Sequence, residues 1–175
     1  MSKTVIKVGL SDTEIDKAIQ EVEQFRQNFR MKVDTYRKRI ADEIAVQASL
    51  NFGSSIVNDA IKGGSPRSAS VQVSVSEQGA VAVVVADGED AVWCEFGAGV
   101  YHNGSVGSSP NPYGTTLGFT IGSYGKGYGK RQAWGYYDEG GELVITRGTP
   151  ATMPMYNAAQ EIMRKSVAIA REVFG

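Results

Sequence analysis

No glycine or proline occurs in the 42 residues that follow Leu10, and this stretch carries one regular pattern. Ser11 and Glu14 have the spacing of a capping box, which marks the start of a helix. Apolar residues then recur at a mean spacing close to 3.6, the period of one helix face. They are Ile15, Ala18, Val22, Phe25, Phe29, Val33, Tyr36, Ile40 and Ile44. We therefore expect a helix over residues 12–52, roughly 60 Å long.

A helix of this length exceeds what a domain of 175 residues needs. Two arrangements fit the pattern. In the first, the helix is kinked into two pieces that fold over one sheet; in the second, one end projects and packs against another subunit. The opposite face carries cations interleaved with acids, which is typical of a solvated face, with a nucleic-acid role as the lesser alternative. These cations are Lys17, Arg26, Arg30, Lys32, Arg37, Lys38 and Arg39.

The composition fits one domain that spans residues 1–175, since 42% hydrophobic residues suffice for a core and the length leaves little room for a second domain. A formal charge of −1 argues against general binding to polyanions. The single cysteine cannot form an internal disulfide, and the first residues lack the apolar run of a signal peptide, so we expect synthesis inside the cell. No window approaches the roughly 18 apolar residues that span a bilayer, so we expect no membrane partner.

Two short elements are expected beside the long helix. Before it, the stretch Thr4 to Leu10 reads as a strand. After it, a short apolar helical turn is expected around Ile56, Val57, Ala60 and Ile61.

Alternation predicts an antiparallel sheet in the middle of the chain. Val71, Val73 and Val75 alternate with polar residues, which indicates a sheet with one solvated face. A turn at 77–79 leads into residues 80–86, which are apolar throughout. We expect this second strand to be central in the sheet.

A third strand is expected over residues 92–96, and a hairpin of residues 133–138 and 142–146 is expected to close the sheet. Pro154 suits the first turn of a final helix. Its predicted core positions are Tyr156, Ala159, Ile162, Met163, Ala170 and Val173. These elements together predict an α+β fold: a long N-terminal helix and a C-terminal helix packed on an antiparallel sheet, with a long Gly-rich loop.

Cys94 is the only cysteine, and strand alternation groups it with apolar Val92 and Phe96. A nucleophilic cysteine needs a helix N-terminus or a cation to lower its pKa, whereas apolar and acidic neighbours raise the pKa of Cys94. We therefore expect a small buried hydrophobe, with an exposed inert thiol or a dyad with His102 as lesser alternatives. The acids around His102 lack metal-ligand spacing, so we predict no metal site. Without an activated cysteine we also predict no enzyme activity, and we expect no cofactor.

Residues 97–132 form the segment in which we expect function. They contain ten glycines and no Asp or Glu, and loops of this length are uncommon inside compact domains unless they are functional or disordered. The Walker A and dinucleotide-binding motifs both fail here. The second half alternates glycine with aromatic and basic residues, namely Tyr124, Lys126, Tyr128, Lys130 and Arg131.

Three interpretations of this basic aromatic stretch remain open, and one of them is plain disorder. The first is a flexible loop that orders against a protein partner. The second is contact with DNA through residues 122–137, because basic residues neutralise phosphates and aromatic rings stack on bases.

Two segments and the order of the elements resemble the minor tail or tail-completion (head–tail joining, neck) proteins of long-tailed phages. In that family a third strand ends in a Glu-Phe-Gly-Thr-like turn, and a Pro-aromatic start opens the C-terminal helix. Glu95-Phe96-Gly97-Ala98-Gly99 is similar to the turn, and Pro154-Met155-Tyr156-Asn157-Ala158-Ala159 is loosely similar to the helix start. The chain departs from the family in having Ala98 for threonine, Met155 for phenylalanine and Ala158 for a second proline.

The resemblance implies a structural virion subunit of the neck or tail end, synthesised in the bacterial host cytoplasm. It implies a ring of copies of the chain, expected to be a hexamer, that joins a head connector or head-closure protein to tail tube or tail terminator proteins. The partner-contact residues would be Phe96, Gly97, Gly99, Tyr124, Lys126, Tyr128, Lys130 and Arg131. The contact of the basic loop would be with a neighbouring subunit or with DNA in the channel. A small DNA-binding protein is the alternative function.

Overall fold

A computed structural model of the chain describes residues 6, 9, 11–57, 67–99, 107–114, 116–117, 119–121, 132–137 and 140–175. The strand expected from Thr4 to Leu10 falls largely outside these residues. The elements in chain order are α1 (Asp12–Ser54), β1 (Ile56–Val57), β2 (Arg67–Ser68), β3 (Gln72–Gln78), β4 (Val81–Asp87), α2 (Glu89–Phe96), β5 (Gly107–Ser108), β6 (Thr120–Ile121), β7 (Trp134–Tyr137), β8 (Leu143–Thr146) and α3 (Pro154–Phe174).

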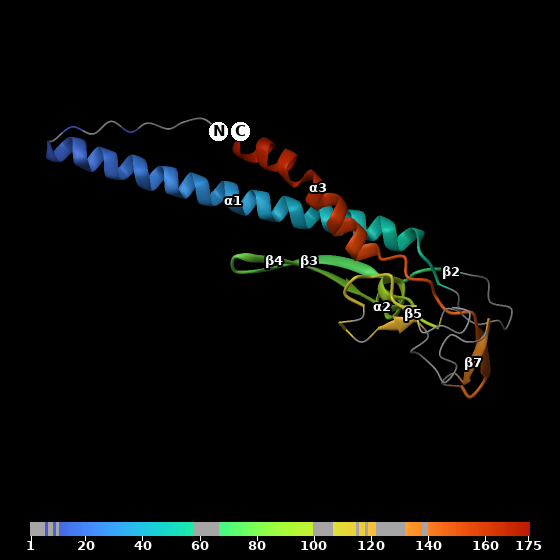
Figure 1. Cartoon of the computed structure of the whole chain (residues 1–175). Helices are drawn as coiled ribbons and strands as arrows, with labels where there is room; N and C mark the ends of the chain where they lie inside the picture. The colour runs from blue at the N-terminus through green and yellow to red at the C-terminus, as the bar shows by residue number, and fades with distance from the viewer. Residues whose placement is uncertain are drawn as a thin grey trace.

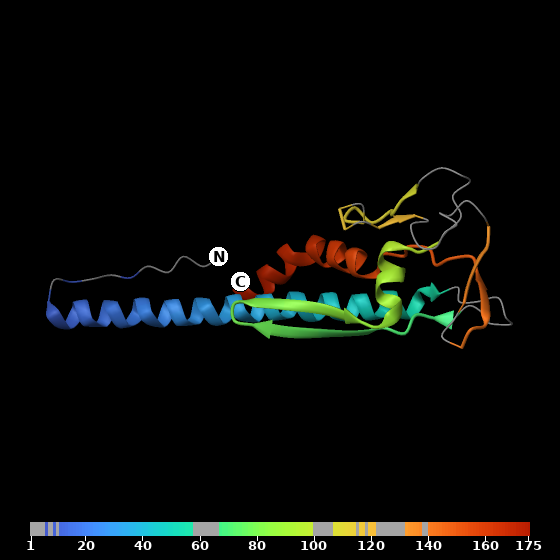
Figure 2. The ribbon, with the colours of Figure 1, turned by 90° about the horizontal axis from the view of Figure 1, so that it is seen from below.

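Helix α1 is a single continuous element of 43 residues, so the kinked arrangement is wrong. Its C-terminal part lies between α3 on one side and the β3–β4 hairpin on the other, while its N-terminal part extends well beyond both (Figures 1 and 2). The α+β fold with long terminal helices is confirmed. No helix among the described residues is long and apolar enough to cross a membrane.

The predicted hairpin in the middle of the chain is confirmed. β3 and β4 pair antiparallel from Gln72 opposite Asp87 to Gln78 opposite Val81. Gly79, with φ of 61°, lies in the turn between them, where a left-handed backbone favours glycine. The side chains of β3 alternate between partly buried and exposed, as one solvated face requires.

The expectation of one sheet with β4 at its centre is wrong. Among the described residues the strands form four separate two-stranded ladders, β1–β2, β3–β4, β5–β6 and β7–β8. The apolar side chains of β4 divide between α1 and solvent, so that Val81 and Val85 remain exposed. The C-terminal hairpin forms as expected, with Trp134 opposite Thr146, but it makes its own ladder.

Residues 92–96 are helical and not a third strand. Gly88, with φ of 142°, ends the hairpin, and α2 begins at Glu89 with two acids in its first turn, where the helix dipole favours them. Five residues of apparent alternation span only about one and a half helical turns, which is too short to separate the two periods. The helical turn is likewise wrong at Ile56 and Val57, because these residues pair with β2, while Ala60 and Ile61 lie outside the described residues.

The buried core lies at the C-terminal end of α1. Phe52, Val57, Ala91 and Cys94 are buried together, and residues of β3, β4 and α3 pack around them. Further along, α1 and α3 meet through small or branched side chains, which allow close helix approach. The buried ones are Ala41, Ala48, Ala158, Ile162 and Ile169. Met163, which we expected on the core face, is 65% exposed.

The core position of Phe52 predicts a large cost of truncation. Phe52→Ala removes a ring that is 1% exposed and leaves a cavity, so we expect a loss of about 3–5 kcal/mol in unfolding free energy. Phe25→Ala is the matched control, because Phe25 is 52% exposed and should cost less than about 1 kcal/mol in the dilute protein. Urea unfolding followed by circular dichroism measures both, and similar losses would contradict this account of the core.

Candidate functional site

The candidate site is the turn after α2, where three of the predicted contact residues lie. Phe96 ends α2, Gly97 follows with φ of 78°, and Gly99 has φ of 61°. The other five predicted contact residues lie outside the described residues, so the structure does not test them: Tyr124, Lys126, Tyr128, Lys130 and Arg131. The described parts of segment 97–132 include the β5–β6 ladder and a turn between its strands.

The side chain of Glu95 reaches from α2 to the first turn of α3. Its Oε2 accepts a hydrogen bond from the backbone N–H of Met155 at 2.8 Å, and its Oε1 accepts one from that of Tyr156 at 3.0 Å. Pro154, the first residue of α3, has no N–H to satisfy. A carboxylate from another helix therefore caps α3, where the free N–H groups and the helix dipole favour negative charge.

A third donor completes the environment of Glu95. Asn111 Nδ2 donates to Glu95 Oε1 at 2.8 Å, and both side chains are buried. Burial raises the pKa of the Glu95 carboxyl, while the N–H groups of Met155 and Tyr156 and the amide of Asn111 oppose the rise. Glu95 thus fixes three segments that are distant in sequence: α2, the turn at Asn111 and the start of α3.

The backbone around Gly97 is held closely against the segment before α3. The carbonyl of Cys94 accepts hydrogen bonds from the N–H groups of Thr152 and Met153 at 2.8 and 3.1 Å. Ala98 and Thr149 exchange two backbone hydrogen bonds of 2.8 Å each. A Cβ on Gly97 would lie 3.1 Å from the backbone nitrogen of Ala151, and its positive φ also disfavours a side chain.

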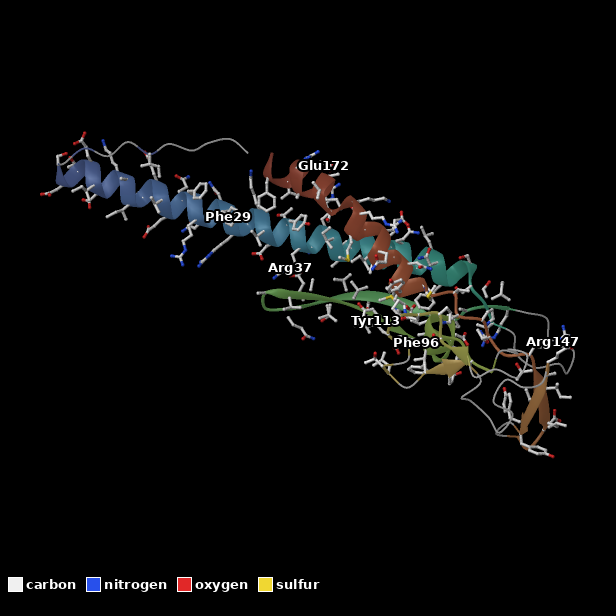
Figure 3. All side chains as sticks on the ribbon, in the orientation of Figure 1. Phe29, Arg37, Phe96, Tyr113, Arg147 and Glu172 are labelled. Atoms are coloured by element: carbon white, nitrogen blue, oxygen red, sulfur yellow. The ribbon has the colours of Figure 1, made fainter. Side chains whose placement is uncertain are left out.

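Phe96 anchors the described part of the Gly-rich segment. Its ring stacks on that of Phe119, with centroids 4.4 Å apart and planes 7° from parallel. Ser109 Oγ donates to the carbonyl of Phe96 at 2.7 Å. Tyr113 lies nearby on the same segment and meets Tyr156 of α3 edge to face, with centroids 6.2 Å apart (Figure 3). Phe96 therefore contacts its own chain, and its contact with a partner stays a prediction.

An ion pair between Arg67 and Asp90 connects β2 to α2. Arg67 Nη1 and Nη2 donate to the two carboxylate oxygens of Asp90 at 2.6 and 3.0 Å, and the N–H of Ser70 donates to the same carboxylate at 2.8 Å. Burial would raise the pKa of Asp90, but the hydrogen bonds from Arg67 and Ser70 and the charge of Arg67 hold it below its ordinary value. This pair orients the first turn of α2, and so places Glu95.

Cys94 is fully buried within the core, as expected. Burial and the nearby charge of Asp90 raise the pKa of its thiol to about 11. His102, the base of the alternative dyad, lies outside the described residues. Among the residues that the structure describes, no cluster of three His, Cys, Asp or Glu side chains could hold a metal ion.

Sequence reasoning missed the roles of Glu95 and Asn111. Strand alternation placed Glu95 opposite the apolar face, and Asn111, between two prolines, gave only a turn signal. The residues of the Glu-Phe-Gly turn and of the Pro-aromatic helix start are in direct contact, so the two segments that carry the resemblance form one junction. The hydrogen bonds of this junction hold α2, the start of α3 and the turn at Asn111 in place. Comparison of the chain with protein-family models, curated proteins and solved structures finds no match.

The Glu95 cap predicts a measurable stability loss. Glu95→Ala leaves the N–H groups of Met155 and Tyr156 and the amide of Asn111 without their acceptor, so we expect a loss of about 2–4 kcal/mol. Glu95→Gln keeps one acceptor oxygen and should lose less. Urea unfolding measures both variants against Asp42→Ala, an exposed acid on α1. Equal stability of Glu95→Ala and the parent protein would contradict the cap.

Burial of Cys94 predicts an unreactive thiol. At pH 8 a pKa of about 11 leaves about one thiol in a thousand ionised, and the side chain is inaccessible. We expect a thiol-specific dye to leave the native protein unlabelled for hours and to label it stoichiometrically in urea. The control Ser49→Cys places a second, exposed thiol on α1, which should react within minutes. Rapid native labelling of Cys94 would overturn the buried assignment and favour the dyad.

Proposed function

We propose that the chain is a structural subunit of the neck or tail end of a long-tailed phage particle. In this proposal copies of the chain form an oligomeric ring between the head connector and the tail. The resemblance of the Glu95 turn and the Pro154 helix start names the family. The observation that carries an assembly role is the projecting N-terminal part of α1 (Figure 1). Its apolar stripe is exposed from Ile15 to Phe29, and the ring of Phe174 lies beside Phe29 at the inner end of the stripe.

The exposed stripe is larger than scattered surface residues would give. Ile15, Ile19, Val22, Phe25 and Phe29 are between 41 and 52% exposed on successive turns of one helix. Most helical stability in proteins comes from packing of an apolar face, and contiguous apolar patches usually mark interaction sites. Contact with another subunit would bury this stripe and stabilise the projecting helix.

The junction around Glu95 supports the same role. It holds Phe96 and Gly97 at the start of the Gly-rich segment and at the same time caps α3. A loop with fixed ends loses less conformational entropy when it orders against a neighbour. The structure thus provides a stable base for a loop that would contact an adjacent subunit or DNA in the channel.

The proposed neighbours are the head connector or head-closure protein on one side and the tail tube or tail terminator on the other. The alternative, a small DNA-binding protein that uses residues 122–137, depends mainly on residues outside the described ones. It predicts binding to bare DNA that weakens steeply with salt, which an assembly subunit does not require.

Mass spectrometry of purified tailed particles tests the proposal. We expect peptides of this chain in intact particles from an induced lysate of the source organism, at a few to a dozen copies per particle relative to the capsid protein. A lysate protein of similar abundance that should be absent from particles controls for carry-over. Absence of the chain from intact particles would contradict a virion role.

A further inference from the structure

The projecting part of α1 divides into two segments of opposite charge. Residues 12–23, which we call the tip, contain five acidic residues and one lysine. Residues 26–33, which we call the shoulder, contain three cations and no acid. The cations are Arg26, Arg30 and Lys32. The apolar stripe runs through both segments, so large apolar side chains lie beside a net negative charge in the tip and beside a net positive charge in the shoulder.

The shoulder is a shallow apolar surface bordered by guanidinium groups. Phe29 and Val33 line a hollow of about 450 Å³ together with Arg26, Arg30 and Asp34. Within the described residues, Arg26 and Arg30 form no ion pair with a carboxylate. Their charges are therefore available to an acidic partner.

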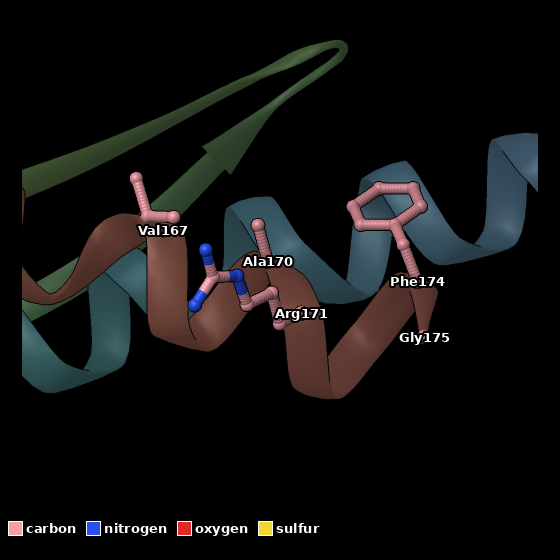
Figure 4. A pocket seen from close by; sticks show the side chains of 5 residues that line it. All are labelled: Val167, Ala170, Arg171, Phe174 and Gly175. Atoms are coloured by element: carbon pink, nitrogen blue, oxygen red, sulfur yellow. The ribbon is translucent and has the colours of Figure 1, made fainter. Parts of the chain in front are cut away.

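Helix α3 ends at the shoulder and covers the stripe only up to that point. The ring of Phe174 lies 5.9 Å from that of Phe29 and 6.0 Å from that of Tyr36. Beside it, Val167, Ala170, Arg171, Phe174 and Gly175 line a second hollow, of about 190 Å³ (Figure 4). A helix from another molecule that packed on the exposed part of the stripe would extend the buried face of α1 beyond the end of α3.

We propose that the tip of one copy docks on the shoulder of a second copy. Glu23 would face Arg26 and Arg30 of the other copy, and Glu21, on the opposite side of the stripe, would face Lys32. Ile15, Ile19 and Val22 would pack on Phe29 and Val33. Since the tip repels polyanions, a second copy suits the shoulder better than a nucleic acid does. The inference deepens the proposed function by naming the surface of self-association.

The geometry of α1 suits this contact. Tip and shoulder lie consecutively on one straight helix, so two antiparallel copies can make both contacts at once. A ring makes the same contact when each tip docks on the shoulder of the next copy. The antiparallel dimer and the ring both pair the tip with the shoulder, so one experiment on these two surfaces tests both arrangements.

Charge reversal of each segment tests the contact in the full chain. The tip variant is Glu21→Lys with Glu23→Lys, and the shoulder variant is Arg26→Glu with Arg30→Glu. All four side chains are exposed, so circular dichroism should show retained folding. In sedimentation equilibrium we expect the parent protein to self-associate and each variant alone to show a dissociation constant raised at least tenfold, because like charges then face each other.

An equimolar mixture of the two variants should restore association, because a basic tip then meets an acidic shoulder. The control pair Asp42→Lys with Arg164→Glu changes exposed charges elsewhere and should associate like the parent. A monomeric parent at all concentrations, or variants that associate normally, would overturn the tip-on-shoulder contact. Either result leaves the particle measurement unaffected, so failure of this inference is distinct from failure of the virion role.

Discussion

The buried carboxylate of Glu95 is the contact on which the arrangement of the C-terminal half depends. It satisfies the first free N–H groups of α3 and the amide of Asn111, and no other side chain in the described residues reaches all three. Because ionised groups are costly to bury, three donors must be in place before the carboxylate is tolerated there. The hydrogen bonds of Glu95 therefore form only when α2, the start of α3 and the turn at Asn111 all lie in their native positions.

The elements with strong local signals were predictable. A long stretch free of glycine and proline, with one apolar period, predicted α1, and Pro154 marked the first residue of α3. The β3–β4 and β7–β8 hairpins followed from alternation and turn residues. Each of these signals is complete within a short window, so it does not depend on how distant segments meet.

The errors concern interactions between distant segments. Residues 92–96 alternate like a strand, but the hydrogen bonds of Glu95 to residues some 60 positions later favour a helix that directs its side chain toward α3. The separation of the described strands into four ladders was also not predicted, because pairing between hairpins leaves no local pattern. The same limit applies to Asn111, whose role is visible only once α2 and α3 are side by side.

The continuity of α1 has a consequence for how the chain tolerates change in length. Inserting or removing residues in this helix of 43 residues both rotates and shifts its outer end, since each residue turns the chain by about 100° and advances it by about 1.5 Å. Loss of one residue near position 35 would swing the whole outer part of the helix to a different side of the molecule. Loss of seven would shorten it by about 10 Å yet return it almost to the same side. A change in the length of this helix should therefore be tolerated best where the residues lost or gained add up to a whole number of helical turns.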